Sequence, residues 1–334
     1  MAEELITFHH TGTLPVLLVS DLDGTLLTPR HTVSKRSIEA LCFAQSRGVQ
    51  IMIASGRSPR SIQKVIDLFE GKMVPDSVIC CNGALTYNPR TKEIDHPAFI
   101  PLDKAIKMVE NLRSHIDQVP GTANAGFSCE VVWINGNGYS DDTYFHCDGP
   151  WELQRKHTFY YDVTVIESME SFLRSLQNPD GTLRGGIIKL MALDRSKTAS
   201  ELYESLPESF MTHSASGDKA PHLELTYSGP YFLEVAAAGV NKGLGLQNYC
   251  SSHKIDRKRV VAFGDLLNDA EMLQYAGLGL CMGNGHVDVK KLANRVIDTN
   301  ADDGVAREIE SWFDLKPSVA AQALPTGGTP SVSD

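Results

Sequence analysis

Residues 17–27 read Leu-Leu-Val-Ser-Asp-Leu-Asp-Gly-Thr-Leu-Leu, so that two carboxylates follow directly on a run of apolar side chains. The apolar run over 14–19 is typical of a buried strand. Because side chains alternate between the two faces of an extended chain, Asp21 and Asp23 can point the same way where that strand ends. Two neighbouring carboxylates repel each other, so this place needs a cation, a shared proton or both. The segment therefore predicts a chemical site at a strand end rather than an isolated cap or turn residue.

Helices and strands alternate on the C-terminal side of this segment. In chain order they are a helix over 34–44, a strand over 49–54 that runs into Ser55, a helix opening at Ser58 and a strand over 78–81 that ends in Asn82. This is the pattern of a doubly wound parallel sheet, which is a Rossmann-like α/β fold. Ligands of such sheets bind outside the carboxyl ends of the strands, which is where Asp21, Ser55 and Asn82 fall.

The middle of the chain has a different pattern, in which strands are flanked by occasional helices. An amphipathic helix over 102–116 and a loop over 135–148 that is rich in Gly, Asn and Asp belong to it. The first pattern returns after residue 237, with a strand over 259–263 that ends in Gly264. We therefore predict a core made of residues 1–84 and 238–315, an inserted α+β cap domain over 85–237, and a disordered tail over 316–334.

Composition limits the classes of partner. The chain has 334 residues, of which 42% are hydrophobic and 22% charged, and its formal net charge is −10. The acidic balance, without a basic block, argues against nucleic acid or an anionic membrane as the main partner. No apolar run approaches the roughly 20 residues of a membrane span, and the N-terminus lacks a signal pattern. Seven scattered cysteines indicate buried thiols in a reducing compartment, so we expect a cytoplasmic protein that is a monomer or a small homo-oligomer.

Four ordered stretches carry a family resemblance. They are Asp-Leu-Asp-Gly-Thr at 21–25, Ser-Gly-Arg at 55–57, Lys242, and Gly-Asp-Leu-Leu-Asn-Asp at 264–269. Together they resemble the four motifs of the haloacid dehalogenase (HAD) superfamily, and their spacing is similar to that of the Cof-type phosphatases of subfamily IIB. The resemblance implies a HAD-like catalytic core with a cap domain. It also implies an Mg²⁺-dependent phosphatase that acts on a small phosphorylated metabolite.

The resemblance gives the acidic residues and the lysine definite roles, and each role is chemically sound. Asp21 would attack phosphorus as an ionised oxygen nucleophile and form an aspartyl-phosphate. Asp23 would protonate the leaving group and then act as the base for water. Mg²⁺ would be held by Asp21, the backbone carbonyl of Asp23 and Asp265, with Asp269 in the outer shell. Lys242 would neutralise the phosphoryl oxygens, although a lysine taken alone is usually a surface residue.

Five further residues are expected to bind phosphate or substrate. Ser55 offers a hydroxyl and Gly56 a bare backbone amide near a helix N-terminus, where anions bind well; Ser55 alternatively caps the next helix. By resemblance Asn268 reaches the phosphate. Arg57 is a substrate contact or a surface charge, and Asn82 a substrate contact or part of a turn.

Two alternatives to a phosphatase remain open from the sequence. A phosphomutase or phosphotransferase of the same superfamily uses the same pair of aspartates. A catalytically silent metabolite-binding protein is the other, although silent relatives are expected to lose one of the aspartates. We also expect residues 85–237 to close over the aspartates as a lid, with Tyr139, Tyr144 or His146 of the loop selecting the substrate.

Overall fold

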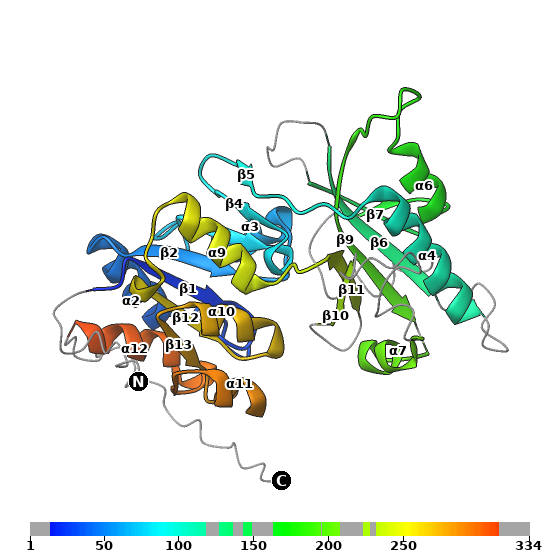
Figure 1. Cartoon of the computed structure of the whole chain (residues 1–334). Coiled ribbons are helices and arrows are strands. Elements are labelled where there is room, and N and C mark those ends of the chain that lie inside the picture. Colours follow the sequence, from blue (N-terminus) through cyan, green and yellow to red (C-terminus); the bar gives the residue numbers. More distant parts are fainter. Residues whose placement is uncertain are drawn as a thin grey trace, which may run out of the picture.

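The computed structural model describes residues 14–117, 127–135, 143–148, 163–194, 196–207, 223–227 and 232–313. These residues form two β-sheets, which Figure 1 shows in separate parts of the molecule, joined by two crossings of the chain. Within the described ranges, no helix is long and apolar enough to span a membrane.

The first sheet has eight strands drawn from both ends of the described chain. In spatial order they are β14 (Arg295–Val296), β13 (Leu278–Cys281), β12 (Val260–Gly264), β1 (Leu17–Asp21), β2 (Gln50–Ala54), β3 (Ser77–Cys80), β4 (Leu85–Tyr87) and β5 (Ile94–Asp95). The strands from β14 to β3 run parallel to one another. β4 pairs antiparallel with β3, and β5 pairs antiparallel with β4. The chain order changes direction between β1 and β12, as in doubly wound sheets. The predicted α/β fold class is confirmed.

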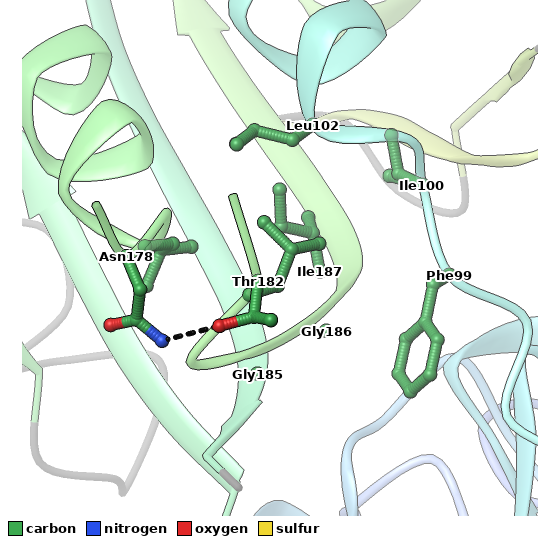
Figure 2. A pocket seen from close by; sticks show the side chains of 10 residues that line it. Phe99, Ile100, Leu102, Asn178, Thr182, Gly185, Gly186 and Ile187 are labelled. Carbon is green, nitrogen blue, oxygen red and sulfur yellow. Dashed lines mark hydrogen bonds between the residues drawn. The ribbon is translucent and has the colours of Figure 1, made fainter. Parts of the chain in front are cut away.

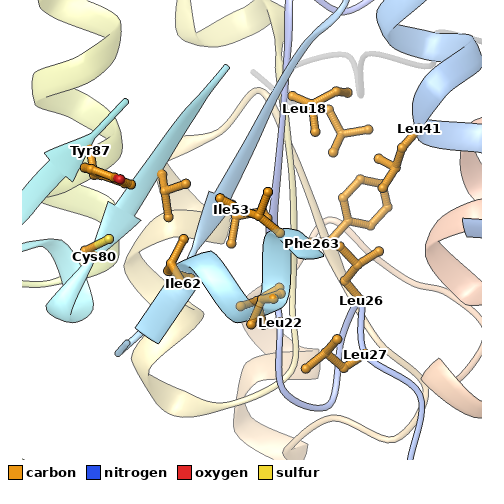
Figure 3. Packing of buried hydrophobic residues seen from close by; sticks show 14 of the residues in the cluster. Leu18, Leu22, Leu26, Leu27, Leu41, Ile53, Ile62, Cys80, Tyr87 and Phe263 are labelled. Atoms are coloured by element: carbon orange, nitrogen blue, oxygen red, sulfur yellow. The ribbon is translucent and has the colours of Figure 1, made fainter. Parts of the chain in front are cut away.

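Helices cover both faces of this sheet, which is why its strands are apolar throughout. On one face lie α2 (Lys35–Ser46), α3 (Pro59–Asp67) and α12 (Gly304–Trp312), and on the other α9 (Lys242–Ser252), α10 (Ala270–Tyr275) and α11 (Val287–Leu292). Leu18 of β1 packs with Leu41 of α2 and Phe263 of β12, as Figure 3 shows. Leu17 and Val19 face the opposite way, toward α9 and α10. Short 3₁₀ turns lie at η1 (Cys81–Gly83), η2 (Arg257–Arg259), η3 (Leu267–Asp269) and η4 (Asn300–Asp302).

The second sheet lies in the segment that we predicted to be an insert. In spatial order its strands are β10 (Leu223–Thr226), β11 (Leu233–Ala237), β9 (Gly185–Asp194), β6 (Phe127–Asn135), β7 (Thr143–Asp148) and β8 (Thr164–Val165). One face packs against α4 (Leu102–Asp117), α6 (Met169–Ser175) and α7 (Ala199–Ser205). The opposite face carries Val132, Ile134 and Met191, which belong to the apolar cluster of the first sheet. The second sheet therefore has one face on its own helices and the other toward the first sheet.

The hairpin β4–β5 differs from the prediction, because it belongs to the first sheet. We placed the start of the insert at Leu85, but β4 pairs with β3 through Cys80 and Leu85. Tyr87 and Ile94 are buried in the cluster of the first sheet, so the hairpin both adds to that core and covers the edge of β3. The chain leaves the first sheet only after Asp95. The division into core and cap domains stays a prediction, and the predicted tail lies outside the described residues.

The predicted loop over 135–148 is also different, because β7 occupies its second half. Threonine and aromatic residues favour a strand there, and β7 pairs with β6 through Val131 and His146. The His146 ring stacks on Phe172 of α6 at 4.3 Å between centroids, and its Nδ1 accepts a hydrogen bond from Trp133 Nε1 at 3.1 Å. His146 is thus packed under α6 rather than placed in a substrate loop. Tyr139 lies outside the described residues, as does the side chain of Tyr144.

The two crossings are close to each other at Gly83 and Asn241. Gly83 has a φ of +103°, and a Cβ added to it would lie 2.0 Å from the carbonyl oxygen of Asn241. Gly239 also has a positive φ of +72°, but its position is open, with nothing within 4 Å of an added Cβ. Only glycine fits at Gly83 without moving the second crossing.

We therefore expect Gly83→Ala to destabilise the protein more than Gly239→Ala. The control variant Gly239→Ala carries only the left-handed backbone penalty, about 1–2 kcal/mol. Gly83→Ala adds the steric clash, about 1–3 kcal/mol more. Urea unfolding of the two variants measures the difference, and equal losses would mean that the approach to Asn241 is not tight.

Candidate active site

Four predicted residues meet at the carboxyl edge of the first sheet. Asp21 is the last residue of β1, and Asp265 directly follows the neighbouring strand β12. The turn η3 returns Asp269 to the same place, and Lys242 is the first residue of α9. The chain order reverses between β1 and β12, so the two strand ends open a crevice there. This is the position at which doubly wound sheets bind ligands.

Lys242 is the buried centre of this group. Its Nζ contacts Oδ1 of Asp21 and Oδ1 of Asp269, both at 2.6 Å, and its side chain is only 1% exposed. Burial lowers the pKa of Lys242, but the attraction of the two carboxylates outweighs burial, so the pKa is raised above its ordinary value. Lys242 therefore stays protonated at any physiological pH. Asn241 fixes the start of the helix by accepting the backbone N–H of Leu244 at 2.8 Å.

The carboxylates of Asp21, Asp265 and Asp269 form a cluster that suits a cation. One oxygen from each lies within 4.8 Å of the others, and all three residues are buried. Burial raises the pKa of Asp21 well above its ordinary value; Lys242 opposes this rise, and the two neighbouring carboxylates add to it. Burial likewise raises the pKa of Asp265 to about 6, although the hydroxyl of Thr25 opposes this by donating to its Oδ1 at 2.8 Å. Three carboxylates around one ammonium group are a set of hard oxygen ligands that fits Mg²⁺.

Asp269 also organises the backbone of the cluster. Its Oδ2 accepts the backbone N–H groups of Asp265 at 2.9 Å and Leu266 at 3.0 Å. A Cβ added to Gly24, which has a φ of +89°, would lie 2.3 Å from Oδ2 of Asp265. Glycine is therefore required after Asp23, because the loop must pass directly over the Asp265 carboxylate.

Asp23 lies apart from this cluster and is paired with Arg57. Arg57 Nη2 donates to both oxygens of Asp23, at 2.9 and 3.1 Å, and the carboxylate is 46% exposed. Arg57, which the sequence left as a substrate contact or a surface charge, thus binds the second aspartate of the pair in this structure. Two planar groups bonded in this way hold each other in orientation.

The predicted phosphate-binding residues come together beside the carboxylates. Ser55 is buried, and its Oγ accepts the N–H of Arg57 at 3.2 Å, whereas Ser58 is the residue that caps α3. Asn82 has a φ of +55°, and its backbone N–H donates to the carbonyl oxygen of Ser55 at 3.0 Å. Asn268 Nδ2 donates to Asn82 Oδ1 at 3.3 Å. A Cβ added to Gly56 would lie 3.1 Å from Asn82 Oδ1, so the glycine also allows this packing.

Sequence reasoning missed two charged residues that adjoin this group. Glu234 accepts a hydrogen bond from Asn82 Nδ2 at 2.9 Å and forms an ion pair with Lys189 at 2.8 Å. Lys189 also donates to the carbonyl oxygen of Gly56 at 3.3 Å. Both residues come from strands of the second sheet, β9 and β11. The sequence offered one signal for them, because each is a charged residue within a mostly apolar strand segment. Charged residues are seldom buried without a partner, so such a position indicates a buried ion pair or hydrogen bond.

A pocket of about 670 Å³ lies elsewhere, on the second sheet. Figure 2 shows it between Phe99, Ile100 and Leu102 of the first crossing on one side, and the turn that carries Asn178 and Thr182 on the other. None of its lining residues belongs to the carboxylate cluster. The candidate active site is therefore the crevice at the sheet edge rather than this pocket.

Comparisons with known proteins show the family of the chain. The sequence profile of the haloacid dehalogenase-like hydrolases matches residues 18–309. A 5-amino-6-(5-phospho-D-ribitylamino)uracil phosphatase from Bacillus subtilis is 27% identical over 91% of this chain and 99% of its own length. A pyridoxal phosphate phosphatase from Escherichia coli is 28% identical over 88% of this chain and 97% of its own.

A solved structure described as a sugar phosphatase of HAD subclass IIB shares the fold. Its TM-score is 0.67 at 24% identity, and the match covers 89% of this chain and 98% of that one. The profile match spans most of the chain and includes all four motifs, and the relatives are named phosphatases. The predicted family and enzyme class are confirmed: the chain belongs to the haloacid dehalogenase-like hydrolases and is a phosphatase.

Proposed function

We propose that the chain is an Mg²⁺-dependent phosphatase that hydrolyses a small phosphorylated metabolite through an aspartyl-phosphate on Asp21. The observation that carries this proposal is the buried contact of Lys242 with Asp21 beside two further carboxylates. The named relatives act on a ribityl phosphate and on pyridoxal phosphate, so the proposed class is a phosphate monoester of a small polyol, sugar or ring compound.

Asp21 is the proposed nucleophile because it ends β1 inside the crevice and has one oxygen fixed by Lys242. Its attack on phosphorus forms the bond from the carboxylate oxygen to phosphorus and releases the substrate oxygen. Water then attacks the phosphorus of this mixed anhydride, which frees inorganic phosphate and restores the carboxylate. The ammonium group of Lys242 stabilises the negative charge that builds up on the phosphoryl oxygens.

Asp21 and Asp265 would hold Mg²⁺ through their carboxylates. Lys242 contacts Oδ1 of Asp21 and Thr25 contacts Oδ1 of Asp265, so the second oxygen of each would be the ligand. Asp269 supports both, through Lys242 and through the backbone N–H of Asp265. When bound, the ion would neutralise the carboxylates and polarise the phosphoryl group.

Asp23 is the proposed acid for the leaving oxygen and base for water. In this structure its carboxylate is held by Arg57, so it must leave Arg57 before it can protonate a substrate oxygen. Ser55, Gly56 and Asn268 are the proposed phosphate donors, because they border the crevice and supply a hydroxyl, a backbone amide and a side-chain amide. The second sheet contacts this edge through Lys189, which supports the expectation that it covers the leaving group.

Asp21→Asn is expected to lower the turnover of any phosphate ester by more than about 100-fold, a barrier increase of ~2.7 kcal/mol, because an amide cannot act as the nucleophile. Asp288→Asn on α11, which changes an exposed carboxylate, is the matched control and should keep wild-type rates. Initial rates with Mg²⁺, together with circular dichroism to show that the fold persists, make the measurement. A variant rate above a hundredth of wild type would rule out Asp21 as the nucleophile.

Asp23→Asn is expected to slow the hydrolysis of sugar phosphates much more than that of activated aryl phosphates, since only the alkoxide leaving group needs a proton. The ratio of kcat/KM between the two substrate types tests this. Equal losses on both, under conditions where the chemical step limits the rate, would contradict the acid role.

Magnesium is expected to raise the thermal unfolding temperature at pH 7.5, and less so as the pH falls to 6 and below. The pKa of Asp265 is raised from an ordinary value of 3.8 to about 6, so protons compete with the ion there. Without metal, the native state binds more protons than the unfolded chain between these values, so this carboxyl destabilises the fold increasingly as the pH rises through that window.

Asp265→Asn should therefore stabilise the metal-free protein at pH 7.5 and remove most of the Mg²⁺ response. The amide keeps an oxygen for Thr25 and loses the charge that the neighbouring carboxylates repel. Differential scanning fluorimetry with and without Mg²⁺ gives both values. A full Mg²⁺ response in this variant would exclude Asp265 as a ligand.

A further inference from the structure

Lys189 and Glu234 lie on the face of the second sheet that is turned toward the active site. Glu234 is opposite Met191 across β11 and β9, and Met191 belongs to the apolar cluster of the first sheet. The neighbours Leu233 and Val235 belong instead to the cluster under the helices of the second sheet. Both charged residues are buried, at 5% and 6% exposure. Glu130 of β6 is opposite the same Met191 and is buried as well, so this face encloses several charged side chains between the sheets.

Lys189 takes this orientation from the regular alternation that follows it in β9, where Leu190 belongs to the helix-side cluster and Met191 to the cluster of the first sheet. A β-bulge lies directly before it. The pairing of β6 with β9 runs from Val132 with Lys189 directly to Trp133 with Ile187, which leaves Ile188 as the extra residue. Ile187 consequently packs under the helices, although in a regular strand it would share a face with Lys189. The bulge therefore changes the face of the residues before it, whereas Lys189 keeps the face of Met191 and reaches the carbonyl oxygen of Gly56.

The pair is joined to the phosphate-binding residues by a directional chain of hydrogen bonds. Lys189 contacts Oε1 of Glu234, and Asn82 Nδ2 donates to Oε2 of the same carboxylate. Because the amide nitrogen of Asn82 faces Glu234, its oxygen faces Asn268 and accepts from Asn268 Nδ2. The reversed amide would place its oxygen against a carboxylate and its nitrogen against another N–H group. The charge of Glu234 therefore decides which way both amides point.

We propose that Glu234 is a positioning residue, which fixes the amides of Asn82 and Asn268 for phosphate binding, and that Lys189 holds Glu234 and ties the second sheet to the backbone at Gly56. The inference rests on the proposed phosphatase function. A buried ion pair contributes little net stability, so its value here is the orientation that it imposes. Substrate binding should then depend on a contact between the two sheets that itself does not touch the reacting atoms.

The test measures the inhibition constant of inorganic phosphate with the full-length Mg²⁺-loaded enzyme. In Glu234→Gln the ammonium of Lys189 attracts the new carbonyl oxygen, so the amide N–H₂ faces Asn82 and reverses it. The inhibition constant is expected to rise at least about tenfold, and KM to rise with it more than kcat falls. Lys189→Met alone leaves the carboxylate on Asn82, so stability should fall while the inhibition constant changes less than about threefold.

The double variant Lys189→Met/Glu234→Gln separates positioning from packing. Without the ammonium group, the glutamine carbonyl can turn back to Asn82, so the inhibition constant is expected to return to within about threefold of wild type. Glu310→Gln, at the part-buried pair of Arg36 on α2 and Glu310 on α12, is the matched control, which should lose stability without any change in phosphate binding.

Three results would overturn the inference. They are a wild-type inhibition constant in Glu234→Gln, a double variant no better than that single variant, and a Glu310→Gln control that weakens phosphate binding equally. If Glu234→Gln does not fold, Asn82→Gly, which tolerates the positive φ, takes its place, and a wild-type inhibition constant there has the same meaning. A wild-type enzyme that hydrolyses no phosphate ester contradicts the proposed function instead.

Discussion

The buried ammonium group of Lys242 is the constraint on which the site depends. It lies between Asp21 and Asp269, 2.6 Å from each, and neither carboxylate is more than 8% exposed. Removing a charge from water is costly unless partners replace the water. Lysine and the two aspartates therefore require one another, although Asp21 is separated from Lys242 by 221 residues in the sequence. This mutual requirement fixes α9, β1 and η3 around a single point.

The backbone around that point is shaped to keep the carboxylates close together. Asp269 gives one oxygen to Lys242 and the other to two backbone N–H groups, so it cannot turn away. Gly24 lets the loop after β1 pass over Asp265, and Gly83 lets the two crossings meet. Such close approaches leave no room for a Cβ, which limits these positions to glycine. The fold thus keeps the carboxylates close together despite their repulsion, which a bound cation would relieve.

Much of the fold and the site follows from local sequence pattern, but pairings over long distances do not. The strand ends at Asp21 and Asp265 could be predicted, because apolar runs followed by acidic residues mark the edge of a doubly wound sheet. The hairpin β4–β5 was assigned to the insert, since a short strand carries no information about which sheet it joins. The contact of Asn82 with Glu234 spans 152 residues, and no spacing rule reaches so far. The face of Lys189 could not be predicted from the start of β9, because the bulge at Ile188 breaks the alternation of side chains there.

The charges at the carboxyl edge of the first sheet form neutral ion pairs on either side of a central group, the three carboxylates with Lys242, that is not neutral. Arg57 balances Asp23 on one side, and Lys189 balances Glu234 on the other. When all groups are ionised, the three central carboxylates and Lys242 carry a net charge of −2, which one divalent cation balances.

In the proposed mechanism, an incoming phosphate group would meet a centre without excess positive charge. Beside Lys242 and the cation, the groups proposed to bind it are a hydroxyl and amides, which hold an anion by direction more than by charge. The orientation of these donors would consequently matter more than that of a cluster of arginines. Inorganic phosphate, the product, would also be released more readily from neutral donors. In this proposal the ion pair in the second sheet sets that orientation without adding charge to the centre, so residues of the first sheet would bind phosphate while a contact from the second sheet, at Asn82 and Gly56, orients them.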